Sequence, residues 1–143
     1  MFSLAILLNI DSKNEDVAAL IRLLREADYH DYLVDFLLSF IDKKCSENYP
    51  DFKWSNTYES LKDVVESENK ENAIALLKSY LDNQWYDIHK ECAWHDSHKS
   101  TKTTYYGYWS FESGALAKAL ELDDSSLKEQ LYYPYDLVHR GDD

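Results

Sequence analysis

Apolar residues at helical spacing are the feature that most constrains the fold of this chain. They recur every three or four residues, which is the period of one buried face on an α-helix. The segments with this spacing are 17–26, 30–42, 58–66, 69–88 and 111–122. The 143 residues include only 3 glycines and 2 prolines, and a β architecture built on tight turns uses more of both. We therefore predict an all-α fold of about six helices, packed as a single compact domain over residues 1–143.

Polar residues mark the predicted starts of several helices. Ser12 and Glu15 have the spacing of a capping box, in which the two side chains bond free amides at the helix start. Asn69 is predicted to cap the helix that follows it, and Ser110 is predicted to cap a helix over 111–122. These positions set the expected boundaries of three helices.

The N-terminal third offers one further helix and one long loop. The apolar run 3–10 is predicted to be the first core helix, and its side chains are expected to support self-association of the chain. The segment 45–55 contains Pro50 and shows no periodicity, so we predict a loop there. Phe52 and Trp54 are expected to pin this loop to the body of the domain.

The helix predicted over 30–42 is amphipathic. Its apolar residues form one face, and Asp31, Asp35 and Asp42 are predicted to lie away from that face. No strand is predicted in the chain, because the only candidate, 103–109, is short.

The stretch 105–138 carries the densest clusters of chemically distinctive residues. Two aromatic runs, at 105–109 and 132–135, flank an acidic pair at 123–124. Pro134 disfavours helical geometry in the residue before it, so the second run is predicted to be a fixed, aromatic-rich loop. The rings expected inside the core are Trp85, Trp109 and Phe111, and the tyrosines expected partly outside are Tyr106, Tyr133 and Tyr135.

Three motifs in this stretch carry a resemblance to a known family. They are Gly107–Glu112 (GYWSFE), Leu122–Leu127 (LDDSSL) and Tyr132–Leu137 (YYPYDL). In this order they resemble the C-terminal domain of PoNi-type immunity proteins, and the dipeptide 85–86 and the segment 94–98 (WHDSH) also resemble that family. The family protects bacteria from PoNe-type DNase toxins of polymorphic toxin systems. In its common form it carries a further N-terminal helical domain, which this chain is expected to lack.

The resemblance implies an immunity protein that binds and inhibits a cognate bacterial DNase, with no enzymatic activity and no cofactor. The net charge of −12 and the pI near 4.7 argue against direct binding of nucleic acid, which requires clusters of Lys and Arg. The same acidity favours a basic protein partner. The run 3–10 is far shorter than the roughly 20 residues that span a bilayer. Cys45 and Cys92 are predicted to be free, buried thiols, and we expect a cytoplasmic location.

Acidic and aromatic side chains of these motifs are the candidate partner-binding residues, since they suit contact with a basic protein. They are Asp96, Tyr106, Asp123, Asp124, Tyr133, Tyr135 and Asp136. The candidate structural residues of the same motifs are Trp85, Trp94, His98, Trp109, Phe111 and Glu112. Glu112 is expected to stabilise the first turn of its helix through the helix dipole. Asp123 is expected to face solvent without a structural role.

Two alternatives belong to other functional classes. One is a small metal-dependent hydrolase, since histidines and a cysteine spaced by three superficially resemble a metal site. These residues are His89, Cys92, His95 and His98, and the candidate catalytic carboxylates are Glu112, Asp123, Asp124 and Asp136. Steps of three drift by about 60° each on an α-helix, so the ligands converge only where the helix breaks. The other alternative is a helical interaction scaffold. We predict no metal site and no catalytic residue.

Overall fold

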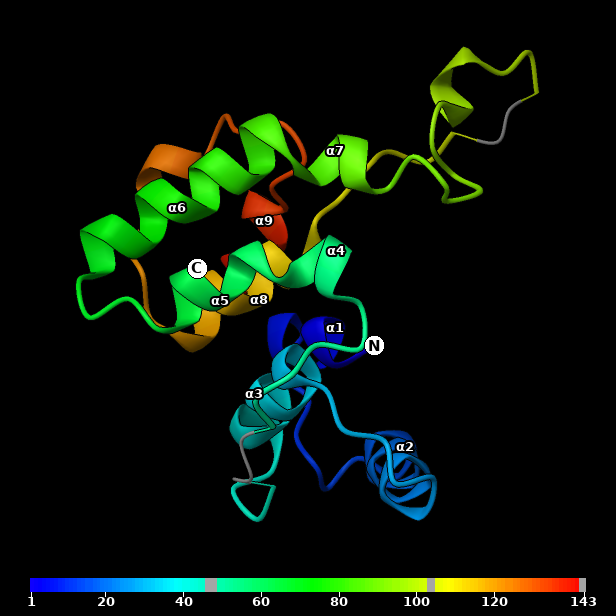
Figure 1. Cartoon of the computed structure of the whole chain (residues 1–143), viewed down its shortest axis with the longest axis vertical. Helices are drawn as coiled ribbons and strands as arrows, with labels where there is room; N and C mark the ends of the chain where they lie inside the picture. Colours follow the sequence, from blue (N-terminus) through cyan, green and yellow to red (C-terminus); the bar gives the residue numbers. More distant parts are fainter. Residues whose placement is uncertain (46–48, 103–104, 142–143) are drawn as a thin grey trace.

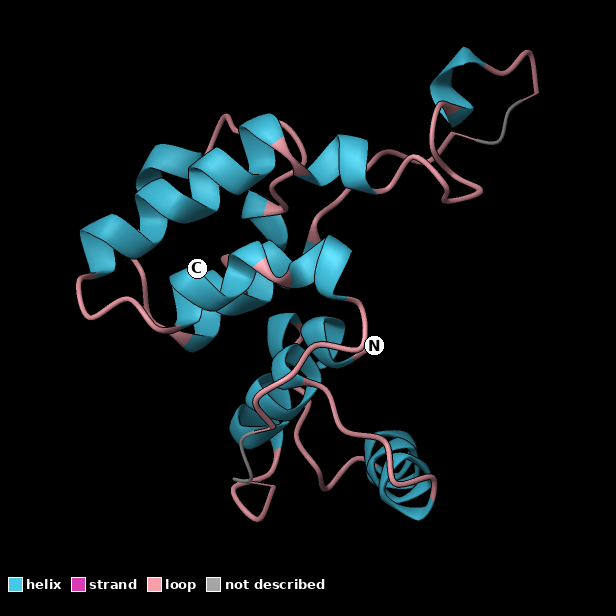
Figure 2. Ribbon diagram, viewed as in Figure 1, coloured by secondary structure: helices cyan, strands magenta, loops and turns pink. Residues whose placement is uncertain are grey.

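The computed structural model describes residues 1–45, 49–102 and 105–141, and over these ranges the chain is helical without any strand (Figure 1, Figure 2). The all-α prediction is confirmed. The α-helices are α1 (Phe2–Leu7), α2 (Glu15–Glu26), α3 (Tyr32–Ile41), α4 (Ser55–Tyr58), α5 (Ser60–Val65), α6 (Lys70–Asn83), α7 (Trp85–Ile88), α8 (Phe111–Ala119) and α9 (Tyr135–Val138). Short 3₁₀ helices lie at Ser97–Lys99 and Ser125–Leu127.

The described helices outnumber the prediction because two predicted helices are broken and one predicted loop is partly helical. The predicted helix over 69–88 divides into α6 and α7 at Gln84, whose φ of −131° lies outside the helical range. The helical segment predicted over 58–66 starts earlier than predicted, because α4 covers Ser55–Tyr58, and it is interrupted at Glu59 before α5 begins at Ser60. Helix α9 begins directly after Pro134, where the missing amide hydrogen costs nothing because a helix start leaves such amides unpaired.

Helix α8 lies at the centre of the core. Helix α1 packs against both α3 and α8, α5 pairs with α6, and α9 packs on α8. The residues 113–117 are all buried, so α8 is covered on every side and not along the single stripe that was predicted. A Cβ atom on Gly114 would lie 2.8 Å from Pro134 Cγ and 3.1 Å from Val138 Cγ2. The small residue at position 114 therefore permits the close approach of α9.

The helix starts agree with the predicted caps at one of three positions. The side chain of Asn69 accepts the amide hydrogens of residues 71 and 72, which confirms the predicted cap of α6. Helix α2 is capped by Asn14 and not by a capping box, since Asn14 accepts from the amides of residues 16 and 17. The hydroxyl of Ser110 makes no cap bond, because it bonds two side chains instead: Oε1 of Glu112 at 2.8 Å and Oγ of Ser113 at 2.6 Å.

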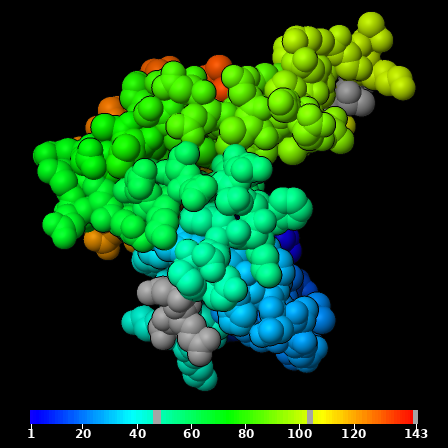
Figure 3. Space-filling view, viewed as in Figure 1, coloured from blue at the N-terminus to red at the C-terminus, as the bar shows by residue number. Residues whose placement is uncertain are grey.

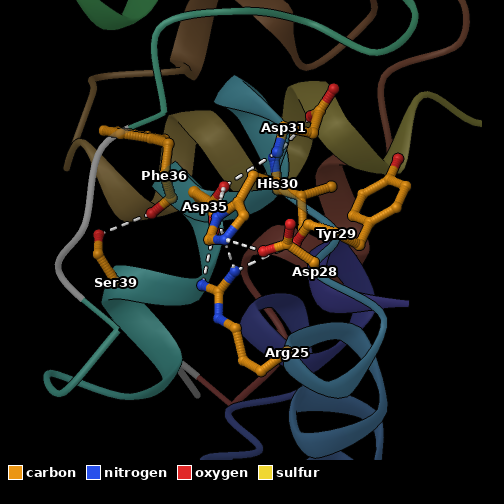
Figure 4. A network of polar contacts seen from close by, with 9 residues as sticks. Arg25, Asp28, Tyr29, His30, Asp31, Asp35, Phe36 and Ser39 are labelled. Atoms are coloured by element: carbon orange, nitrogen blue, oxygen red, sulfur yellow. Dashed lines mark hydrogen bonds and ion pairs between the residues drawn. The ribbon is translucent and has the colours of Figure 1, made fainter.

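Buried carboxylates join α2 to α3, contrary to the prediction that Asp31 and Asp35 lie away from the apolar face (Figure 4). Asp35 is 0% exposed, and its Oδ1 accepts a bond from Nη2 of Arg25 at 2.6 Å. Its Oδ2 lies 3.4 Å from Nδ1 of His30 and accepts the amide of Asp31 at 2.9 Å. Asp31 in turn accepts the amides of residues 34 and 53. These partners supply the charge and donors that a buried carboxylate needs.

The segments around α1 and α4 depart from the prediction in part. Phe52 packs against Tyr32 with ring centroids 4.8 Å apart, as predicted. Trp54, in contrast, is 66% exposed and does not anchor the loop to the body of the domain. Leu7 is fully buried against its neighbours, whereas Leu8 is exposed at the end of α1. The two cysteines, at positions 45 and 92, are free but only half-buried.

The segment after α7 projects from the body of the molecule (Figure 1, Figure 3). It carries the 3₁₀ turn at Ser97–Lys99 and returns toward α8 through residues 105–109. Residues 103–104 of the strand candidate lie outside the described residues, and 105–109 are not a strand. None of the helices in the described ranges is both long and apolar enough to cross a membrane.

Candidate functional site

A groove of about 950 Å³ lies between the projecting segment and the C-terminal segment. Residues of the segments 96–99 and 105–109 other than Ser97 and Tyr106 form one wall, and residues 128–137 form the other. Tyr86 of α7 and Phe111 of α8 complete the lining. The groove therefore brings together the two aromatic runs that the sequence separates.

The first wall is held by hydrogen bonds between its phenols and polar groups. Tyr86 Oη donates to Oδ1 of Asp96 at 2.8 Å and accepts the amide of Asp96 at 3.2 Å. Nζ of Lys99 lies 2.9 Å from the same Oδ1. The hydrogen bond with Lys99, followed by that with Tyr86, lowers the pKa of the Asp96 carboxyl. The hydroxyl of Tyr108 accepts the amide of His98 at 3.1 Å and lies 2.6 Å from Nδ1 of the same residue.

A layer of stacked rings connects this wall to the body. Trp85 stacks on Trp94 with centroids 5.4 Å apart and planes inclined by 19°. Tyr86 stacks on Tyr132 of the second wall at 5.5 Å with planes inclined by 7°. Stacked aromatic pairs gain roughly 0.5–1.5 kcal/mol beyond the burial of their area. The two walls are therefore joined through ring contacts at the base of the groove.

Glu112 fixes the ring layer to α8. Its Oε1 accepts Nε1–H of Trp85 at 2.6 Å as well as the hydroxyl of Ser110 at 2.8 Å. Burial, and then the nearby charge of Glu112, raise the pKa values of Tyr58 and Tyr80. Glu112 is in the first turn of its helix, as predicted, but its partners are side chains that the sequence does not place beside it.

The second wall rests on a buried carboxylate. The amide of Ser110 donates to the carbonyl of Tyr132 at 2.8 Å. Oδ2 of Asp124 accepts the hydroxyl of Tyr133 at 2.6 Å, and Oδ1 lies 2.9 Å from Nε2 of His139. Burial, followed by the bond to Asp124, raises the pKa of Tyr133. This cluster holds the backbone that leads into α9.

The rim of the groove exposes large apolar side chains. Trp109 is 50% exposed and Leu131 is 66% exposed. Gly107 has a φ of +95°, and a Cβ atom there would lie 2.7 Å from Nε1 of Trp109. The indole therefore lies against the glycine backbone, and its position depends on the absence of a side chain at residue 107.

The structure places most of the predicted site residues at this groove. Those that line it are Asp96, His98, Trp109, Phe111, Tyr133, Tyr135 and Asp136. Trp85 and Trp94 lie in the ring layer, while Tyr106 is 89% exposed and Asp123 is also exposed, both outside the lining. Asp123 has a local role that was not predicted, because its Oδ1 accepts the amide of Ser125 at 3.2 Å.

Two predictions of burial are wrong, and both errors have tertiary causes. Trp109 was expected inside, but it lies over the bare backbone of Gly107 at the rim. Tyr133 was expected partly outside, but its ring is buried in the core, where its hydroxyl finds a partner in the buried Asp124. The prediction that Trp85 is inside is confirmed, whereas Phe111, also expected inside, is only half-buried and lines the groove.

Several lining residues were not predicted, and two of them contribute strongly to the groove. Tyr86 bonds Asp96 and Tyr108 bonds His98, and the two rings contact each other with centroids 5.4 Å apart and planes tilted by 53°. The available signals were the family-like motifs, since Tyr86 belongs to the dipeptide 85–86 and Tyr108 to Gly107–Glu112. The return of the projecting segment onto α7 depends on contacts between distant residues, and local periodicity does not report them.

The residues considered for metal binding or catalysis do not converge on one site within the described residues, and Nε2 of His95 is buried without a hydrogen-bond partner there. Nδ1 of His89 donates to the carbonyl of Trp85 at 2.6 Å, the ring of His95 packs on Tyr86 at 4.1 Å, and His98 bonds Tyr108. Within the part of the chain that the structure describes, no group of three or more His, Cys, Asp or Glu side chains is arranged to hold a metal ion.

Comparison with known proteins gives one match. The family model described as PoNe immunity proteins (PoNi), C-terminal, matches residues 29–137. This range contains α3 to α8, α9 except its last residue Val138, and all residues of the groove, and it begins after the end of α2. No curated protein and no solved structure matches the chain.

Proposed function

The chain belongs to the family of PoNe immunity proteins (PoNi), C-terminal, and from this membership we propose that it binds a cognate PoNe-type DNase toxin and inhibits it. The observation that carries the proposal is the family match over residues 29–137, which covers most of the chain. Inhibition in this proposal occurs by binding alone, so the chain needs no reaction, cofactor or metal of its own.

The charge of the chain supports a basic partner. The net charge of −12 attracts a positively charged nuclease over a Debye length of about 8 Å at physiological ionic strength. Buried aromatic contacts then slow dissociation, and a slow dissociation rate makes an inhibitor effective at equal molar amounts. The acidic surface repels the DNA substrate of the toxin, which favours blocking of the nuclease over competition for DNA.

The exposed and half-buried members of the predicted site suit contact with the toxin. They are Asp96, Tyr106, Asp123, Tyr135 and Asp136. Asp124 and Tyr133 bond each other inside the domain, and we assign them a supporting role beneath this surface.

Titration of a purified PoNe-type DNase with the purified chain tests the proposal. Cleavage of plasmid DNA is expected to fall linearly and to end near one chain per nuclease. A DNase from an unrelated family serves as the control and should be unaffected. Unimpaired cleavage by the PoNe-type enzyme at a molar excess of the chain would contradict the proposed function.

The salt dependence of binding tests the electrostatic part of the proposal. Raising the salt concentration should slow association markedly and change the dissociation rate little, since screening acts mainly on the approach of the two proteins. Surface plasmon resonance with immobilised, inactivated nuclease measures both rates. An association rate that is equal at low and high salt would argue against an acidic binding face.

A further inference from the structure

We propose that the groove between residues 96–99 and 105–109 on one side and residues 128–137 on the other is the toxin-binding surface, and that it seats an arginine of the toxin whose guanidinium contacts Trp109 and the carboxylate of Asp136. This inference rests on the proposed function and deepens it by naming the surface and the chemistry of the partner group. Three observations support it. The rim exposes aromatic side chains, two acidic side chains of the lining have no partner among the described residues, and in a second groove a lysine of the chain already contacts the carboxylate and the ring.

The rim provides an aromatic anchor in a fixed position. Tyr105 and Trp109 are each 50% exposed, and Leu131, which also lines the groove, is 66% exposed. Exposed apolar side chains gathered in one groove mark protein contacts, and tryptophan is enriched among the residues that dominate binding energy. The close contact between Trp109 and the backbone of Gly107 orders the indole before a partner arrives. Less conformational entropy is then lost on binding.

The acidic groups of the lining differ in whether they have a partner. Asp96 is paired with Lys99, whereas Glu129 and Asp136 are exposed and make no ion pair or hydrogen bond with the described residues. Nζ of Lys128 lies 5.9 Å from the ring centroid of Tyr135 and occupies that aromatic face. The negative charge available to a partner therefore lies at Glu129 and Asp136.

An arginine fits this combination better than a lysine. Its planar guanidinium stacks on an aromatic ring while it donates two parallel hydrogen bonds to a carboxylate. An ammonium group is a compact, strongly hydrated charge that cannot make both contacts in this way. A groove that presents an exposed indole and a carboxylate without a partner among the described residues accordingly favours arginine.

A second groove, of about 610 Å³, offers less to a basic partner. It lies between α3 and α5, and its carboxylate, Glu66, is already bonded by Tyr32 at 3.3 Å and paired with Lys62 at 3.8 Å. Nζ of Lys62 also lies 5.1 Å from the ring centroid of Tyr32. Lys62 of the chain itself thus already pairs with the carboxylate of Glu66 and covers the ring of Tyr32, the two groups that a basic partner would need there.

Matched pairs of variants test which surface binds. Trp109→Ala is compared with Trp54→Ala, since both rings are exposed and Trp54 lies outside the groove. Asp136→Lys is compared with Asp63→Lys, which makes the same charge change at an exposed position of α5. The probe is a catalytically inactive form of a PoNe-type DNase that the wild-type chain inhibits, and melting temperatures confirm that all variants fold.

We expect Trp109→Ala to weaken the affinity about 30-fold or more and Asp136→Lys about tenfold or more. The two control variants should stay within about twofold of the wild type. Groove variants that bind as tightly as their controls would overturn the proposed surface while leaving the proposed function intact. Failure of the wild-type chain to inhibit the active DNase would instead overturn the proposed function.

Changes on the toxin test the choice of arginine. Surface arginines of the inactive DNase are replaced by lysine one at a time, and each product is tested with wild-type chain and with Trp109→Ala. At least one replacement should weaken wild-type binding about tenfold, because the stacked contact is lost, and should weaken Trp109→Ala much less. If every replacement leaves wild-type binding unchanged, the arginine anchor is wrong.

Discussion

The N-terminal and C-terminal parts of the molecule each hold a carboxylate in a different way: Asp35 is buried, whereas Glu112 is half-buried. Near the N-terminus, Asp35 meets the full positive charge of Arg25 at 2.6 Å, and this pair fixes one helix to another. Near the C-terminus, Glu112 accepts bonds from the neutral indole of Trp85 and the hydroxyl of Ser110. The first arrangement stabilises the fold alone, whereas the second positions the rings beneath the groove. Loss of either should cost stability, but only the second should also cost binding.

The largest effect on stability is expected for Asp35→Ala. The substitution leaves Arg25 without its buried partner and leaves the amide of Asp31 without its acceptor. Breaking a buried ion pair costs about 3–5 kcal/mol, and we expect about 3 kcal/mol because water can reach the partly exposed Arg25. Urea denaturation measures the loss. Asp63→Ala, at an exposed position, is the control and should change stability by no more than about 0.5 kcal/mol.

Toxin affinity of Asp35→Ala sharpens the comparison. At a temperature where the variant is folded, its affinity for the inactive DNase should match the wild type. An affinity loss as large as that of a groove variant would show that the N-terminal network also shapes the binding surface.

Glu112→Ala should lower both stability and affinity. It removes the charged acceptor of Trp85 and Ser110, and a hydrogen bond to a charged group contributes about 1.5–3 kcal/mol. We expect a loss of about 2 kcal/mol in the free energy of unfolding, together with weaker toxin binding because the ring layer loosens. Glu112→Gln keeps an acceptor oxygen and should recover part of both losses. Wild-type affinity in folded Glu112→Ala would contradict the link between this carboxylate and the groove.

Gly107→Ala should have a smaller effect on stability and a clear effect on binding. The residue has a φ of +95°, which costs a side chain about 1 kcal/mol, and the new Cβ would displace Trp109. Gly141→Ala is a matched control, since Gly141 has the same φ and no atom lies within 4 Å of its Cβ position. Thermal melts and toxin affinity compare the two. Equal affinities would show that the position of the indole does not matter for binding.

The smallest effect is expected for Lys99→Ala on the first wall. The pKa of Asp96 is lowered in the folded chain, chiefly by the hydrogen bond with Lys99. The ionised Asp96 carboxylate therefore contributes its full share of stability above the unfolded pKa of about 3.9, and this share is lost as the pH falls through the folded pKa. The variant should raise the pKa of Asp96 toward its ordinary value and reduce this contribution. Carboxyl titration by NMR measures the change, and an unaltered pKa would remove Lys99 as its main cause.

Local signals in the sequence predicted the helices well and the buried polar groups poorly. The end of α2 at Glu26 and the cap at Asn69 follow from periodicity and capping chemistry within a few residues. The burial of Asp35 depends on Arg25, a residue of the preceding helix, and the exposure of Trp109 depends on the backbone of Gly107. Such pairings are set by tertiary packing, so a single sequence does not reveal them.

The candidate site, too, was predicted only in part from local signals in the sequence. The family-like motifs drew attention to both aromatic runs, and the structure places these runs on opposite walls of one groove. The sequence did not predict that Tyr86 would join them, because its stacking on Tyr132 requires the chain to return from the projecting segment. The motifs thus located the groove, whereas its geometry required the fold.

Amide hydrogen exchange of the chain, alone and bound to the inactive PoNe-type DNase, tests the central claim most directly. We expect binding to slow exchange in residues 105–109 and 128–137, which form the walls of the groove, and to leave α3 and α5 unchanged. Slower exchange confined to α3 and α5, with the groove segments unaffected, would contradict the claim that the toxin binds at the groove.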